Sequence, residues 1–278
     1  METQGTASRS GSGTGTVAIV TGGADGIGWA TARRLALEVD HVVVADLRTE
    51  AAAARAAELG DTHWSCAANV ADEAAVVAMV EAVIARHGRI DILVNNAGVA
   101  ENSVPTIEQS VESFDRVLGV HLRGTFLASR EVGRAMLTRG SGSIINIASI
   151  AGLAGIPERN AYGAAKAGIA AMTRSMACEW AAGGVRVNAV APGYVRTALV
   201  DELERQGTLD ARAIIARTPM GRMARPEEIA EVIAFLASPR ASFVTGTTVN
   251  ADGGWLAVGA PEGVLSSPHP PPHMPGRR

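Results

Sequence analysis

The segment Val17-Ala18-Ile19-Val20-Thr21-Gly22-Gly23-Ala24-Asp25-Gly26-Ile27-Gly28 decides the fold. Its first four residues are apolar, and all of them except Ala18 are β-branched, which is typical of a buried strand. The glycines predict a tight turn, and the apolar periodicity from Ile27 to Leu37 predicts a helix. A strand, a glycine-rich turn and a helix in this order let the backbone approach a pyrophosphate closely, and the helix N-terminus offers it N–H groups. The segment therefore predicts a dinucleotide site.

Short apolar runs alternate with longer helix-periodic stretches along the rest of the chain. This alternation predicts an α/β fold with a Rossmann-type, doubly wound parallel sheet and helices on both faces. No proline- or glycine-rich linker divides the core, so we expect a single domain over residues 15–257, between a flexible tail at 1–14 and a proline-rich tail at 258–278. The further strands are expected at 41–45, 64–68, 90–94, 143–147, 186–190 and 248–251, and the further helices at 50–59, 72–87, 111–138, 162–182 and 227–236.

The composition excludes several classes of partner. The net charge is −3 and 47% of the residues are hydrophobic, which favours neither nucleic acid nor an anionic membrane. No apolar run approaches the roughly 18 residues of a membrane span. The first residues lack the apolar core of a secretory signal, so we expect a cytoplasmic protein. The two cysteines, Cys66 and Cys178, are interpreted as small core residues, and we expect no metal site.

Two rare residues lie close together in the chain. Lys166 is the only lysine among 25 basic residues, and Tyr162 is one of two tyrosines. Arginine and lysine differ in geometry and in how readily their pKa moves, so a site that keeps lysine indicates a need for an ammonium group. Tyr162 and Lys166 are four residues apart in a predicted helix and share one face. We expect the ammonium to lower the pKa of the phenol toward neutrality, which suits a general acid/base.

An acidic residue follows the second predicted strand. Asp46 lies 18 residues after Gly28, where a carboxylate accepts hydrogen bonds from an adenosine ribose and repels a 2′-phosphate. The glycine turn itself carries the acidic Asp25. Both residues favour NAD over NADP. Arg48 instead favours NADP, because an arginine there can accept a phosphate. A helix N-cap or a turn residue is the other interpretation of Asp46.

Together these residues resemble the short-chain dehydrogenase/reductase family. The resemblance covers about residues 15 to 255, and its motifs occur in the family's order. Ser149 precedes Tyr162 by 13 residues, as in the family. The matching motifs are Thr-Gly-x-x-x-Gly-x-Gly at 21–28, Asn-Asn-Ala-Gly at 95–98, Tyr-x-x-x-Lys at 162–166, Asn-x-x-x-Pro-Gly-x-x-x-Thr at 188–197, Val244-Thr245-Gly246 and Asp252-Gly253-Gly254.

The resemblance implies an oxidoreductase that interconverts a secondary alcohol and a ketone by hydride transfer. Tyr162 is then the general acid/base, Ser149 binds the substrate oxygen and Lys166 also holds the nicotinamide ribose. His121 stands where the family usually has an asparagine that helps to hold a water in a proton relay, and a histidine titrates near neutrality. A histidine of the core or of the helix surface is the other interpretation. The implied cofactor is NAD, with NADP less favoured. Besides Tyr162 and Lys166, its expected binding residues are Gly22, Asp25, Gly26, Ile27, Gly28, Asp46, Leu47, Asn69, Val70, Asn95, Ala97, Gly98, Pro192, Gly193, Val195 and Thr197.

The substrate side is less defined. We expect segments 152–160 and 194–223 to line and cover an apolar pocket with one or two polar anchors. The expected partner is a small-molecule alcohol or ketone, and the resemblance implies a homotetramer. Two other functions fit the same residues: an NADP-dependent 3-oxoacyl thioester reductase, and a nicotinamide-binding regulator without catalysis.

Overall fold

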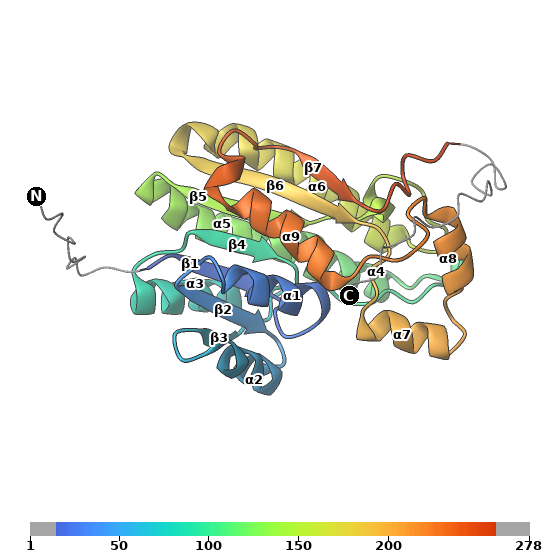
Figure 1. Ribbon diagram of the computed structural model, residues 1–278, viewed down its shortest axis with the longest axis horizontal. Helices are drawn as coiled ribbons and strands as arrows, with labels where there is room; N and C mark the ends of the chain where they lie inside the picture. The colour runs from blue at the N-terminus through green and yellow to red at the C-terminus, as the bar shows by residue number, and fades with distance from the viewer. Residues whose placement is uncertain (1–14, 260–278) are drawn as a thin grey trace, which may run out of the picture.

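A seven-stranded parallel β-sheet forms the centre of the protein (Figure 1). The computed structural model describes residues 15–259, and every strand pair within them is parallel. The strand order is β3-β2-β1-β4-β5-β6-β7, which confirms the predicted Rossmann-type α/β fold. The strands are β1 (Val17–Thr21), β2 (His41–Asp46), β3 (Trp64–Ala67), β4 (Ile92–Asn95), β5 (Gly142–Ile147), β6 (Val185–Pro192) and β7 (Thr248–Ala251).

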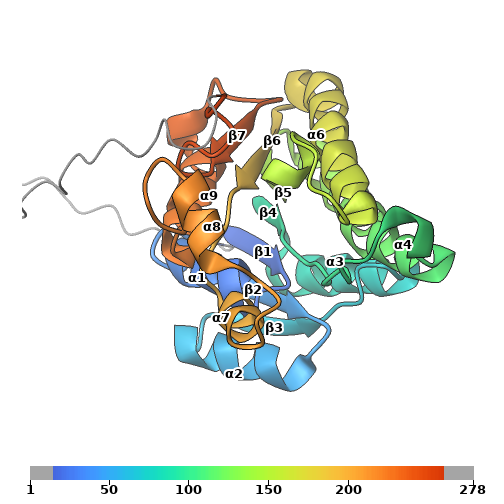
Figure 2. The same ribbon diagram turned by 90° about the vertical axis from the view of Figure 1, so that its right-hand side faces the viewer.

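Helices cover both faces of the sheet, as Figure 2 shows. One face packs against α1 (Gly26–Leu35), α2 (Thr49–Leu59) and α9 (Pro226–Ala237), and the other against α3 (Glu73–His87), α5 (Gly124–Arg139) and α6 (Asn160–Trp180). Because both faces are covered, the central strands β1 and β4 are buried at every position rather than at alternate ones.

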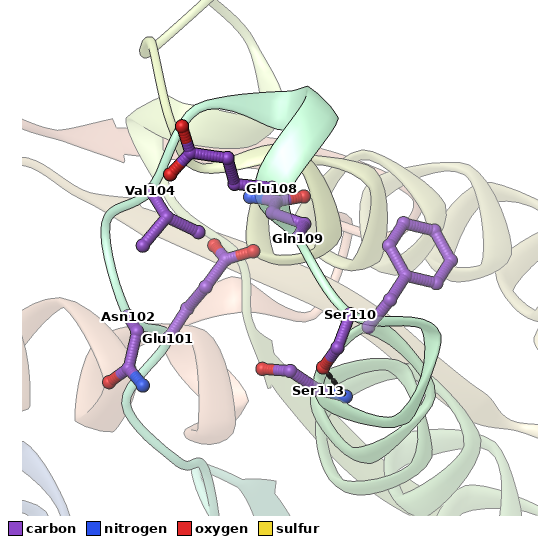
Figure 3. Close-up of a pocket in the computed structure, with 8 residues that line it drawn as sticks. Glu101, Asn102, Val104, Glu108, Gln109, Ser110 and Ser113 are labelled. Atoms are coloured by element: carbon purple, nitrogen blue, oxygen red, sulfur yellow. Dashed lines mark hydrogen bonds between the residues drawn. The ribbon is translucent and has the colours of Figure 1, made fainter.

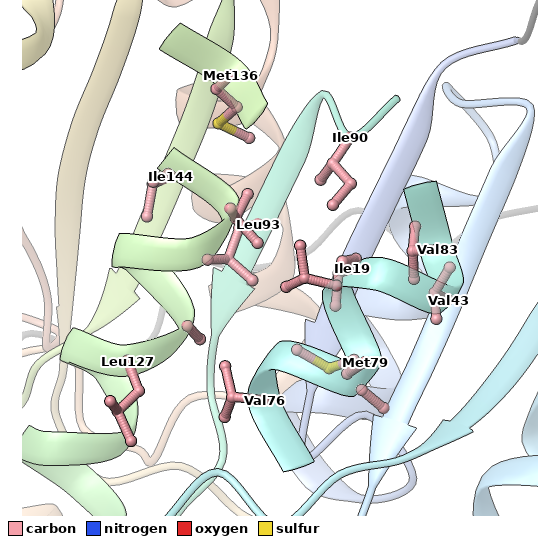
Figure 4. Packing of buried hydrophobic residues seen from close by; sticks show 14 of the residues in the cluster. Ile19, Val43, Val76, Met79, Val83, Ile90, Leu93, Leu127, Met136 and Ile144 are labelled. Atoms are coloured by element: carbon pink, nitrogen blue, oxygen red, sulfur yellow. The ribbon is translucent and has the colours of Figure 1, made fainter. Parts of the chain in front are cut away.

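The two faces of β1 show how this packing works. Ala18 and Val20 belong to the cluster that contains Leu35 of α1 and Ile233 of α9. Val17 and Ile19 belong to the opposite cluster, which Figure 4 shows from close by. In that cluster α3 and α5 contribute their apolar faces, including Met79, Val83 and Met136. The two layers hold the ends of β1, β4 and β5 rigidly in place.

The strand order reverses between β1 and β4. From β1 the chain proceeds to β2 and β3 on one side, and then to β4 through β7 on the other. In open parallel sheets, such a reversal leaves a crevice outside the carboxyl ends of the two strands, where ligands bind. The loops after β1, β4 and β5 therefore converge on one edge of the sheet.

The structure corrects two predicted features. The single helix expected at 111–138 is interrupted: α4 (Val111–Leu118) passes into a π-helical turn, Gly119–Arg123, before α5 begins. A π-turn inserts one extra residue, and such turns are frequent at functional sites. No helix was predicted in segment 194–223, and the structure places two there, α7 (Ala198–Arg205) and α8 (Ala211–Arg217). Short 3₁₀ turns occur at Thr106–Glu108, Ile150–Gly152, Ala181–Gly183 and Pro239–Ala241.

The prediction that both cysteines are core residues was wrong for Cys178. Cys66 is partly buried against the core, whereas Cys178 is exposed because it lies on the outer side of α6, next to the buried Ala177. No helix within residues 15–259 is long and apolar enough to cross a membrane. The same residues hold no cluster of metal-ligating side chains. The two predicted tails lie outside the described residues, apart from Val258 and Gly259.

Candidate active site

The glycine turn after β1 adopts a backbone that only glycine tolerates. Gly22 and Gly26 have φ angles of 60° and 51°, in the left-handed region. A Cβ atom on Gly28 would lie 2.0 Å from the carbonyl oxygen of Gly22. Asp25 caps α1, since its Oδ1 accepts a 2.7 Å hydrogen bond from the Gly26 N–H. The turn is therefore closed tightly around the N-terminus of α1.

Hydrogen bonds join this turn to the loop after β4. Thr21 Oγ1 accepts from the N–H groups of Asn96 and Ala97, each at 3.1 Å. In return, Asn96 Nδ2 donates to the carbonyl oxygens of Thr21 and Gly22 at 3.0 Å. These contacts fix the two loops at the point where the strand order reverses.

A cleft of about 450 Å³ opens over this junction. Its lining includes the predicted cofactor residues Gly22, Asp25, Gly26, Asp46, Leu47, Asn69, Val70, Ala97, Gly98 and Thr197. The structure adds Arg48, Ala68, Asn96, Val99, Val120 and Leu199. Of these, the sequence had already marked Asn96 by its motif, Arg48 by its place after Asp46 and Leu199 by its segment. Ala68, Val99 and Val120 became recognisable only once the fold brought their segments together.

Several predicted cofactor residues do not line this cleft. Asn95 is buried beneath it, where its Nδ2 donates to Ser129 Oγ and Asn146 Oδ1, both at 2.8 Å. Val195 is buried in the core of the α1 and α9 face. These residues support the cleft from behind. Ile27, Gly28, Pro192 and Gly193 likewise lie outside its lining.

Asp46 is held rigidly at the end of β2. Its Oδ2 accepts from the Ala24 N–H at 3.1 Å and its Oδ1 from the Arg48 N–H at 3.0 Å. The Arg48 side chain is more than half exposed and lies within ion-pair distance of both Asp46, at 3.5 Å, and Asp25, at 3.7 Å. The carboxylate thus faces the cleft with an arginine beside it.

Asn69 and Thr197 each have a structural hydrogen bond at the edge of the cleft. Asn69 Oδ1 accepts from the Ala71 N–H at 3.2 Å, and Thr197 Oγ1 caps α7 by accepting from the Val200 N–H at 3.3 Å. Both oxygens have a second lone pair, so these bonds leave each residue able to accept once more.

The structure brings Ser149, Tyr162 and Lys166 together. Ser149 follows β5, where its Oγ accepts from the Ala151 N–H at 3.1 Å, and it is hydrogen-bonded to the phenol of Tyr162. Lys166 Nζ lies 5.4 Å from the centre of the Tyr162 ring and donates to the Ile147 carbonyl at 2.6 Å. The three side chains come from adjacent ends of β5 and α6, so the helical spacing and the strand end together create the cluster.

The electrostatics of this cluster differ from the expectation. Desolvation raises the pKa of Tyr162, and the hydrogen bond with Ser149 opposes this rise only in part. Burial lowers the pKa of Lys166 to about 7. The ammonium was expected to pull the phenol toward neutrality, but in this structure burial is the larger influence on both groups because it penalises their charged forms.

His121 lies behind Tyr162, in the π-helical turn. Its ring meets the Tyr162 ring edge-on, with centres 5.1 Å apart, and its Nε2 lies 2.9 Å from the Val99 carbonyl oxygen. Burial, together with the charge of Lys166, lowers the pKa of His121 to about 3. The expectation of a histidine that titrates near neutrality is therefore wrong. Its Nδ1 is buried and has no partner among the described residues.

Comparisons with known proteins show which family the chain belongs to. The family model described as enoyl-(acyl carrier protein) reductase matches residues 22–256. An uncharacterized short-chain type dehydrogenase/reductase of Sinorhizobium fredii is 45% identical over 90% of this chain, which spans 45% of that relative's length. The cis-4-hydroxycyclohexanecarboxylate dehydrogenase of Sinomonas cyclohexanicum is 46% identical over 87% of this chain and 97% of its own. The crystal structure of levodione reductase matches with a TM-score of 0.83 at 38% identity, over 87% of this chain and 98% of that one.

The chain therefore belongs to the short-chain dehydrogenase/reductase family, whose members bind nicotinamide cofactors. It is an oxidoreductase of this family.

Replacing Gly28 with alanine tests the turn. The added Cβ would meet the Gly22 oxygen at 2.0 Å and Asn96 Nδ2 at 2.4 Å, so we expect NADH binding to weaken roughly tenfold or more. Gly119→Ala is the matched control, because its Cβ would meet no atom within 4 Å and its backbone is helical. Titration of NADH fluorescence measures both. Equal affinity in the two variants would contradict the role of the turn.

Replacing His121 with asparagine tests its buried, neutral state. Between about pH 6.5 and pH 3 the unfolded chain binds a proton at this histidine and the folded chain does not, so stability falls as the pH falls through that range. Between pH 8 and pH 4.5 we expect the free energy of unfolding of the parent to fall by about 3 kcal/mol more than that of His121→Asn. Urea unfolding at both pH values measures this, and parallel losses would contradict it.

Proposed function

We propose that the protein interconverts a secondary alcohol and a ketone, with NAD as its cofactor and Tyr162 as general acid/base. The observation that carries this proposal is the cluster of Ser149, Tyr162 and Lys166 beside the dinucleotide cleft. It joins a proton-transfer group, a hydrogen-bonding group for the substrate oxygen and a buried cation, which together serve chemistry at a CH–OH carbon.

In alcohol oxidation, Ser149 positions the substrate hydroxyl and the Tyr162 phenolate takes its proton. The C–H bond breaks as a hydride, the C=O bond forms, and the proton remains on the Tyr162 oxygen. The bound nicotinamide supplies the acceptor for the hydride, or its donor in the reverse reaction. Because the pKa of Tyr162 is raised, the phenolate fraction and hence the rate of oxidation should grow as the pH rises.

Lys166 and His121 support this proton transfer. Lys166 donates one N–H of its ammonium group to the Ile147 carbonyl. Its other two N–H groups can donate to a ribose and toward the Tyr162 phenol. The unpaired Nδ1 of the neutral His121 lies in the same buried region and can bond a water there. We assign His121 the place that the family usually gives to asparagine.

The preference for NAD rests on two acidic residues. Asp46 faces the cleft at the end of β2, and Asp25 lies in the turn, so a 2′-phosphate would meet two carboxylates. Arg48 is the one feature that favours NADP, since its exposed guanidinium could turn toward such a phosphate. In the structure it is engaged with the same two carboxylates, which favours the ribose of NAD.

For the substrate, we infer a compact, mostly apolar secondary alcohol. Leu199 lines the cleft, and Leu153 and Met220 expose apolar surface in the two segments predicted to flank the pocket. The relatives named for cis-4-hydroxycyclohexanecarboxylate and levodione are similar over nearly their whole length. A homotetramer in the cytoplasm remains part of the proposal, and exposed Phe126, Phe235 and Phe243 provide apolar surface for such an assembly.

The first test is a cofactor and substrate assay. The purified protein is incubated with NAD or NADP and a panel that includes cyclohexanol, cis-4-hydroxycyclohexanecarboxylate, polyols, hydroxysteroids and 3-hydroxyacyl thioesters, and reduced nicotinamide is followed by absorbance. We expect turnover with NAD and little with NADP. Preference for NADP and a thioester would overturn the role of Asp46 and favour the 3-oxoacyl reductase, whereas binding of NADH without turnover would favour a regulator.

Replacing Tyr162 with phenylalanine tests the chemistry. We expect at least a thousandfold loss of turnover, because the variant lacks the hydroxyl that transfers the proton, with NADH affinity nearly unchanged. Tyr194→Phe is the matched control, since Tyr194 is the other tyrosine of the chain and packs against Trp255. Substantial turnover in Tyr162→Phe would refute the assignment.

A further inference from the structure

The helix that carries Tyr162 lacks a cap of its own. The first N–H groups of any helix need acceptors, which a side chain at the N-cap position usually supplies. At α6 the N-cap residue is Arg159, whose side chain makes no such bond, and the first turn contains no acidic residue. Tyr162 lies in this first turn, so whatever satisfies these N–H groups also determines where the phenol lies.

A carboxylate from a distant loop provides the missing acceptors. Glu101 follows β4, and its Oε1 accepts from the Ala161 N–H at 3.0 Å while its Oε2 accepts from the Tyr162 N–H at 3.2 Å. Its residue is only 7% exposed. A negative charge at a helix N-terminus also interacts favourably with the helix dipole. Both oxygens of one buried carboxylate are thus engaged by the backbone of the catalytic turn.

The surrounding contacts keep Glu101 in this place. Arg159 donates from its guanidinium to the Glu101 carbonyl oxygen at 2.9 Å, and Gln109 donates to the carbonyl of Glu158 at 3.4 Å. Glu158 has a φ of 64°, in the left-handed region that non-glycine residues rarely adopt. The chain therefore makes a strained turn just before α6, and the loop after β4 holds that turn.

Figure 3 shows the outer side of the same loop. Glu101 and Glu108 both line a pocket of about 170 Å³, opposite Ser110 and Ser113 at the start of α4. Glu108 is exposed, and its side chain has no hydrogen bond to any described residue. The two glutamates therefore share a loop and a pocket but differ in their contact with α6.

We propose that Glu101 is a positioning residue, whose buried carboxylate caps α6 from the loop after β4 and holds Tyr162 in place for proton transfer. The proposal rests on the proposed function, since it acts through Tyr162. A displacement of about 1 Å at a reacting group can lower a rate by roughly a hundredfold, so a cap in this position affects catalysis more than stability alone.

Charge supports the same assignment. Four charged or titratable side chains face Tyr162: Glu101 from the loop after β4, Arg159 before α6, Lys166 one turn further along α6, and His121 from the π-helical turn. Glu101 raises the pKa of the phenol and Arg159 lowers it. Removal of the Glu101 charge should therefore make Tyr162 ionise at a lower pH.

The test compares Glu101→Gln and Glu101→Ala with the control Glu108→Gln in the full-length protein. Tyrosine labelled with ¹³C at Cζ gives only two signals, from Tyr162 and Tyr194, and Tyr162→Phe assigns them. In Glu101→Gln we expect the Tyr162 titration midpoint to move to a lower pH, because the variant lacks the negative charge that raises the pKa of the phenol. Glu108→Gln should titrate like the parent.

Hydrogen exchange and turnover complete the test. In Glu101→Ala we expect exchange at residues 160–166 to accelerate at least tenfold and kcat on cyclohexanol, with saturating NAD, to fall about tenfold at unchanged NADH affinity. Parent-like titration and exchange in both Glu101 variants would overturn the proposal, as would equal effects in Glu108→Gln. If Glu101→Ala fails to fold, the titration of Glu101→Gln decides. The NMR titration and hydrogen exchange need no substrate, so they test the role of Glu101 independently of the proposed function. An active Tyr162→Phe variant would instead show that the proposed function is wrong.

Discussion

The hydrogen bonds between Thr21 and the loop after β4 are the constraint on which the rest of the site depends. They join the carboxyl ends of β1 and β4 where the strand order reverses, and they do so with a side-chain oxygen that accepts two backbone N–H groups. With these two ends fixed, the glycine turn, the cleft and the loop that carries Glu101 all have a defined position. The cleft is thus a consequence of the topology, closed by a few buried polar contacts.

Burial then determines the electrostatics next to the cleft. Tyr162, Lys166 and His121 lie within one cluster. Desolvation raises the pKa of Tyr162 and lowers the pKa of Lys166 and of His121, so it favours the neutral form of each group. In the proposed reaction, charge that develops on the substrate oxygen would therefore meet fixed dipoles and a titratable ammonium rather than water. The lowered pKa of Lys166, about 7, lets it exchange a proton near neutral pH.

Precise placement of the phenol requires support from outside its own helix. Arg159 provides no side-chain cap for α6, and the left-handed residue Glu158 precedes it, so this helix start depends on contacts across the chain. Glu101 supplies them from the loop that begins at the Thr21 junction. The cleft and the first turn of α6 are in this way held by one continuous segment.

The sequence by itself determined the features that depend on neighbouring residues. The run Val17–Gly28 predicted the strand, turn and helix, the alternation of apolar runs predicted the parallel sheet, and the four-residue spacing of Tyr162 and Lys166 placed both on one helical face. Only the tertiary structure decided the π-helical turn at His121, the exposure of Cys178 and the bonds from Glu101 to a helix 60 residues away. It also decided the directions of the pKa shifts. The reason is physical: turn and helix geometry follow from local backbone preferences, whereas burial and cross-chain hydrogen bonds depend on which distant segments meet, and no local pattern encodes that.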